Sequence, residues 1–138
     1  MASTTAFTNQ AKQDFFNGVH QPADVYKIAL YAAAATNDKT TTAYAVTNEV
    51  SGAGYVAGGI ALVGFTVSIS ADTAYITWST NPSWTGASIT VASALIYNST
   101  RSNKALAVID FGGTFTDAGG TFTVQLPAAG LTAIIRSA

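Results

Sequence analysis

Apolar and polar side chains alternate with a period of two through most of the chain, and this feature constrains the fold most. In the run 61–69, alanine, valine, phenylalanine and isoleucine occupy every second position, with threonine and serine between the last of them. Alternation of this kind, rich in threonine, β-branched and aromatic residues, predicts half-buried β-strands. The same pattern recurs in residues 25–31, 74–78, 89–97, 105–111, 122–126 and 131–135.

Turn residues separate these runs and leave no room for crossover helices. The predicted turns are Asp72-Thr73, Asn81-Pro82-Ser83, 98–103, a loop bracketed by Gly112-Gly113 and Gly119-Gly120, and 127–130. Glycine, asparagine and proline favour turns because they supply the backbone angles that turns need. The segment 51–59 is dense in glycine and predicts an irregular strand or bulge. We therefore expect an all-β protein, an antiparallel β-sandwich or jelly roll of about seven or eight strands.

Only the N-terminal segment has a helical pattern. Thr8 or Asn9 can cap a short helix that runs to roughly Asn17, and Gly18 suits the position just after its end. The sequence thus predicts a helical arm in residues 1–18 followed by a single β-sandwich domain in residues 19–138.

The predicted helix carries an apolar stripe. Phe7, Ala11 and Phe15 lie four residues apart, and Phe16 stands beside them. Such a stripe covers one face of a helix and must pack against something apolar. Two alternatives follow: the stripe docks on the core of its own domain, or the segment is an arm that packs on a neighbouring chain.

Few side chains in this sequence can perform chemistry. The chain of 138 residues has no cysteine and one histidine, His20, beside the turn-forming Gly18 and Pro22. The seven acidic residues follow no known metal-binding spacing. We expect His20 to be structural, bonding local backbone where the helix meets the first strand. We expect no enzymatic activity, no cofactor and no metal.

The low charge limits the partners of this chain. Charged residues make up 9% of the sequence and the net charge is −1, so no basic surface is expected to hold nucleic acid. The stretch 58–69 contains three glycines and is too short for a membrane helix. The N-terminus has no secretory pattern, and we expect synthesis in a cytoplasm. A nearly neutral β-domain is typical of a protein whose faces are covered in a large assembly.

Several segments resemble a family of small structural proteins of tailed-bacteriophage virions. The resemblance is carried, in matching order, by 16–20 (FNGVH), 26–31 (YKIALY), 42–44 (TAY), 47–55 (TNEVSGAGY), 94–100 (ALIYNST), 107–112 (AVIDFG), 120–124 (GTFTV) and 133–136 (AIIR). It implies a virion component on the capsid surface and brings no catalytic residues.

From this resemblance we expect a capsid decoration or cement protein, a homotrimer that binds and stabilises the shell of major capsid protein. The expected contacts are the glycine-rich segment 51–59 and the aromatic residues Phe7, Phe15, Phe16, Tyr44, Tyr55, Trp78 and Trp84. One alternative is a tail, neck or fibre component of the same particle. Another is a carbohydrate-binding module, in which the tryptophans and tyrosines would stack on sugars.

Overall fold

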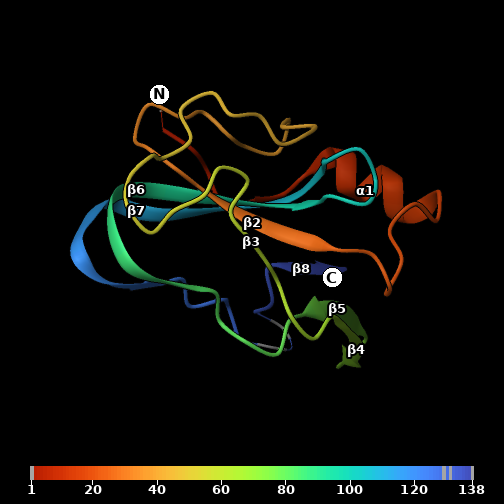
Figure 1. Ribbon diagram of the computed structural model, residues 1–138. Helices are drawn as coiled ribbons and strands as arrows, with labels where there is room; N and C mark the ends of the chain where they lie inside the picture. The colour runs from red at the N-terminus through yellow and green to blue at the C-terminus, as the bar shows by residue number, and fades with distance from the viewer. Residues whose placement is uncertain (1, 129, 131, 138) are drawn as a thin grey trace.

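The computed structural model describes residues 2–128, 130 and 132–137 and shows an all-β, sandwich-like fold, as predicted (Figure 1). A five-stranded antiparallel sheet has the order β1-β7-β6-β2-β3, and a three-stranded sheet has the order β4-β5-β8. The elements are β1 (Ala6–Phe7), α1 (Asn9–Phe16), β2 (Tyr26–Tyr31), β3 (Ile60–Ala61), β4 (Thr66–Ser70), β5 (Thr73–Thr77), β6 (Ser83–Asn98), β7 (Lys104–Thr123) and β8 (Ile135–Ser137).

Strands β6 and β7 form one long hairpin that bends from the larger sheet toward the opposite layer (Figure 1). The prediction of two strands, 105–111 and 122–126, separated by a glycine loop was wrong, because β7 continues through all four glycines. Gly112 and Gly119 have φ angles of 78° and 82°. Glycines with positive φ build the bulges that bend a ribbon without ending it.

The run 61–69 was predicted as one strand and is two. Residues 60–61 form β3 at the edge of the larger sheet, and β4 begins five residues later in the smaller one. Between them Gly64 has a φ of 78°, and a side chain there would collide with Ser79. The chain therefore changes sheets at this glycine while the alternation of side chains continues. The predicted strand 131–135 was also misplaced: β8 begins at Ile135, and Leu131 lies outside the described residues.

The N-terminal segment packs on the larger sheet. Strand β1 pairs with β7, and the fully buried Thr8 caps α1 by accepting a hydrogen bond from the Ala11 amide at 3.1 Å. The hydroxyl of Thr8 also donates toward the carbonyls of Ala105 and Leu106 in β7. Ala11 is fully buried and Phe15 packs against the core cluster. The apolar stripe thus docks on the core of its own chain, the first of the two alternatives.

The main core lies between the two layers. Its largest members come from β2, the concave side of the bent β6–β7 ribbon, and the segments that flank the smaller sheet. A second, smaller cluster on the other side of the larger sheet includes Tyr31, Leu95 and Tyr97, and Tyr44 packs on it from the loop above. No described helix has the length and apolarity needed to cross a membrane.

Candidate interaction surface

An apolar groove separates helix α1 from the smaller sheet. Both elements lie at the same end of the molecule (Figure 1). The groove has a volume of about 670 Å³. From the helical side it is lined by Phe7, Lys12, Phe15 and Phe16, and from the sheet by side chains that include Val67 and Ile76.

The groove exists because the inner face of the smaller sheet is only partly covered. Val67 stands opposite Ile76 in the β4–β5 ladder, and cross-strand partners share a face. Ile76 and its β8 neighbour Ile135 are buried, but Val67 and Ile69 on the same face are 59% and 73% exposed. Strand β4 therefore extends beyond the cover that the larger sheet provides, and core-facing side chains are left open.

Three of the residues predicted as contacts come together at this groove. Phe7 and Phe15 line it and also pack against the core, with their ring centroids 6.0 Å apart. Phe16 lines the same groove and is 95% exposed. An exposed phenylalanine next to other exposed apolar side chains is typical of a binding surface.

The predicted tyrosines serve a different purpose. Tyr44 and Tyr55 both donate hydrogen bonds to the carboxylate of Glu49, and the Gly58 amide donates a third. Burial, reinforced by the Glu49 carboxylate, raises the pKa of Tyr55 far above its ordinary value, so its hydroxyl stays protonated as a donor. This Glu49 cluster fixes the glycine-rich segment 51–59 by hydrogen bonds, and none of its residues lines the groove.

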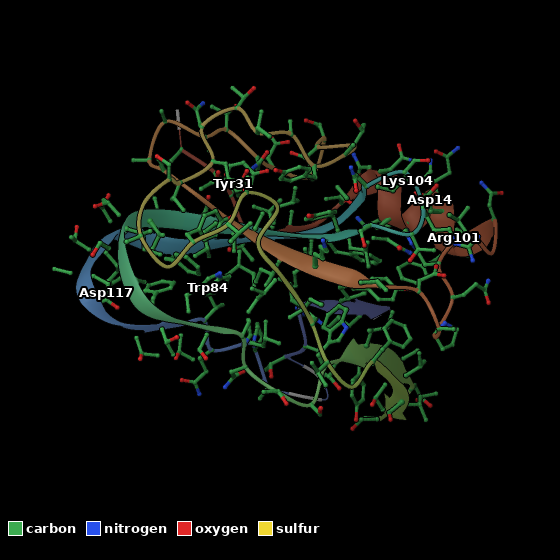
Figure 2. The ribbon with its side chains drawn as sticks, in the orientation of Figure 1. Asp14, Tyr31, Trp84, Arg101, Lys104 and Asp117 are labelled. Atoms are coloured by element: carbon green, nitrogen blue, oxygen red, sulfur yellow. The ribbon has the colours of Figure 1, made fainter. Side chains whose placement is uncertain are left out.

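The predicted tryptophans are core residues. Trp78 and Trp84 are 7% and 3% exposed, so neither presents a ring face to solvent. Trp78 packs edge-on against Tyr26 and Phe65. Figure 2 shows Trp84 beneath the bent β6–β7 ribbon, where its ring packs against Tyr55. A carbohydrate platform built on these two rings has no open face in this structure.

Sequence reasoning missed Lys12, Val67, Ile69 and Arg136 as surface residues of interest. Val67 and Ile69 follow the alternation of a buried strand face, so the pattern assigns them to the core. No signal in the sequence reports where the covering sheet stops. The positively charged Lys12 could have been noticed, because it stands four residues before Phe16 and so shares a helical face with it.

His20 belongs to a buried polar cluster between α1, the following turn and the β6–β7 turn. The expectation of bonds to local backbone was wrong: its Nδ1 accepts a hydrogen bond from the Asn98 side chain at 2.9 Å in the neutral tautomer protonated at Nε2. Nε2 then faces Asp14, 3.6 Å away. Burial lowers the pKa of His20, although the Asp14 and Asp24 carboxylates oppose this. His20 is therefore an enclosed imidazole with one hydrogen bond, to Asn98, and its ring packs near Phe15 of α1 and Tyr26 of β2.

Asp24 anchors the same cluster from the turn. Its carboxylate accepts two hydrogen bonds from the Arg101 guanidinium, at 2.9 and 3.0 Å, and another from Asn98. The Arg101 guanidinium, with help from Asn98 and the Gln21 amide, lowers the pKa of Asp24 to about 2. Figure 2 shows Arg101 at the same end of the molecule as Asp14 and Lys104.

This pairing predicts acid-sensitive stability. Because the pKa of Asp24 is lower in the folded chain than its ordinary 3.8, its contribution is complete above about pH 4 and is lost as the pH falls toward 2. We expect Asp24→Asn to be less stable than wild type at pH 6 but to lose less further stability between pH 4 and 2, as measured by urea unfolding. Arg101→Met should flatten the same acid limb. An unchanged limb in both variants would contradict the assignment.

The described residues contain no group of three or more histidine, aspartate or glutamate side chains arranged to hold a metal ion. Comparison with known proteins identified no matching family model, no similar curated protein and no similar solved structure.

Proposed function

We propose that this chain is a non-catalytic structural protein that works by docking on other subunits of a large assembly. The observation that carries the proposal is the open apolar groove beside α1, with Phe16 almost fully exposed at its rim and Val67 and Ile69 uncovered on the sheet. Exposed apolar side chains gathered at one end of a small domain favour a role in protein association. The enclosed His20 also supports a structural role, since its ring packs near Phe15 and Tyr26 and its Nδ1 accepts a hydrogen bond from Asn98.

The assembly that we propose is a phage particle, with the chain as a decoration or cement protein on the capsid. Two observations on the sequence support this choice: the ordered resemblance to tailed-phage virion proteins, and the near absence of charge. A protein that binds only the assembled shell stabilises that shell by mass action. We further propose that the protein acts as a homotrimer that contacts the major capsid protein.

Particle composition tests this proposal. We expect the chain to be found in purified virions in a fixed ratio to the major capsid protein, and to be located on the shell by electron microscopy. A small copy number at the neck, tail or fibres would favour the alternative location. Absence from purified particles would overturn the virion proposal altogether.

A surface variant tests the docking face. We expect Phe16→Asp to fold normally, because the Phe16 side chain contacts solvent, and to lose most of its occupancy on shells that lack the wild-type protein. Val46→Asp is the matched control, since Val46 is 67% exposed and lies outside both the groove lining and the segment 51–59. Occupancy should be compared by quantitative gel analysis at equal protein concentration. Equal loss in both variants would argue against the groove as the docking face.

A further inference from the structure

We propose that strand β4 and the groove beside it bind an extended, apolar segment of a partner protein that carries an acidic residue, and that this segment adds to the smaller sheet as a new edge strand. The inference rests on the proposed function for the kind of partner, a protein subunit of the assembly, and it names the chemistry of the contact. Three independent features of the described residues lead to it.

The first feature is the backbone of β4. This strand pairs only with β5 among the described strands, so one of its edges is open. The β4–β5 hairpin closes through Ala71 and Asp72, both with positive φ, as in a two-residue turn. In such a hairpin the closing pair Ser70–Thr73 exchanges hydrogen bonds, and the pairs then alternate. The N–H and C=O groups of Val67 and Ile69 therefore point away from β5, toward the open edge.

The second feature is the apolar surface along that edge. The exposed side chains of Val67 and Ile69 lie on the inner face of the sheet, next to the groove. A strand added beside β4 would place every second side chain on this same face. These side chains would cover Val67 and Ile69 and enter the groove, whose volume lies within the range of ordinary ligand pockets. Strand addition with alternate side chains in pockets is a recurrent mode of peptide recognition.

The third feature is the charge around the groove. Its lining includes two cationic residues, Lys12 and Arg136, and no acidic residue. The Lys12 ammonium lies 5.8 Å from the centre of the Phe7 ring, and the Arg136 guanidinium donates to the carbonyl of Ala133. Neither cation forms an ion pair within the described part of the chain. The surface is thus complementary to an apolar segment with a carboxylate.

The same charges disfavour a second copy of this chain as the occupant. Two β4 strands could pair about Ser68, but β4 contains no acidic residue to meet the cations. A different protein segment therefore fits the surface better.

Binding of designed peptides to the full chain tests the inference. The probe is a fluorescent peptide of alternating isoleucine and threonine with glutamate at one end, measured by fluorescence anisotropy. Two matched peptides carry lysine in place of glutamate, or N-methyl groups along one edge that block strand pairing. We expect the lysine peptide to bind about tenfold more weakly, because Lys12 and Arg136 repel its ammonium group but attract the carboxylate of the glutamate peptide. We expect no measurable binding of the N-methylated peptide.

Variants of the chain locate the site. Lys12→Glu should weaken binding of the glutamate peptide and strengthen binding of the lysine peptide, whereas Lys39→Glu, an exposed charge outside the groove lining, should change neither. Val67→Pro removes an amide hydrogen that faces the open edge, and we expect this change to abolish binding. Proline is tolerated in an edge strand, so the variant should still fold. Thermal unfolding verifies that each variant is folded, and the charge exchange at Lys12 keeps the test valid if Val67→Pro is unstable.

Three results would overturn the inference. They are equal binding of the glutamate and lysine peptides, undiminished binding of the N-methylated peptide, and failure of every peptide to bind. Dimers that dissociate on Val67→Pro substitution would assign the edge to a second copy and would also overturn it. The particle experiments remain separate: a chain that occupies shells but binds no peptide would retain the proposed function and lose only this strand-addition mechanism.

Discussion

Replacement of Gly59 by alanine is expected to lower the free energy of unfolding by about 3 kcal/mol or more. Gly59 has a φ of 77°, which strains any residue with a side chain. A Cβ atom at this position would lie 1.7 Å from the carbonyl oxygen of Ile28, a backbone atom of β2 that cannot move aside without breaking the larger sheet. Strain and steric overlap therefore add at one residue.

Substitutions at two other glycines allow the backbone strain and the steric overlap to be measured separately. Gly112 has a φ of 78° but open space around its Cα, so Gly112→Ala should cost only the backbone strain, about 1–2 kcal/mol. Gly113 has neither constraint, and Gly113→Ala should change stability by less than about 0.5 kcal/mol. Urea unfolding of the three variants should rank them in this order. A Gly59 variant as stable as the Gly113 variant would show that Gly59 does not lie in close contact with the backbone of β2.

Replacement of Glu49 by alanine is expected to cost about 2–4 kcal/mol, because three donors lose their acceptor at once. Tyr44 donates to Oε1 at 2.7 Å, while Tyr55 and the Gly58 amide donate to Oε2. The Tyr55 hydroxyl also accepts a hydrogen bond from the Leu30 amide in β2. The cluster therefore joins the loop between β2 and β3 to the larger sheet. We expect the loop to open, with faster amide hydrogen exchange at Gly58 and a lower urea midpoint.

Glu49→Gln is the matched control. It preserves the shape and one acceptor oxygen, so we expect it to cost less than half as much as alanine. Tyr44→Phe removes one donor from the same carboxylate, and the double variant Tyr44→Phe/Glu49→Ala should be less destabilised than the sum of the single variants, because one hydroxyl no longer needs a partner. Additive effects would show that the cluster does not act as a unit.

Local signals predicted the local structure well. The helix begins after Thr8, and Gly18, which follows it, has a φ of 68°, as the capping pattern predicted. The break at Asn81-Pro82 precedes β6, and the polar turn after Asn98 joins β6 to β7. Such signals are reliable because caps and turns depend on neighbouring backbone angles and short-range hydrogen bonds.

Glycine misled the sequence interpretation where its role depends on distant contacts. The four glycines of β7 were interpreted as loop residues, but the strand continues through them. Gly120 pairs with Ala87 of β6, whereas Gly112, Gly113 and Gly119 lie where the register between β6 and β7 shifts. Gly64 was placed inside a strand, but the chain leaves one sheet there and enters the other. A glycine permits a bulge, a turn or a close approach equally well, and the partner strand decides which one forms.

The candidate site was predicted only in part. Phe7, Phe15 and Phe16 meet at the groove, but Tyr44 and Tyr55 serve the Glu49 cluster and Trp78 and Trp84 are core residues. Aromatic residues suit an interface and a core for the same reason, their large apolar area. Their sequence positions therefore could not distinguish the two environments.

The sequence by itself determined that this chain forms strands with one capped helix, because alternation and capping are properties of neighbouring residues. Only the tertiary structure decided which strand faces are covered. Val67 and Ile76 follow the same alternating pattern, but Ile76 is buried and Val67 is open because the smaller sheet extends past the larger one. Burial depends on what lies opposite in space, and that is set by packing between segments far apart in the chain.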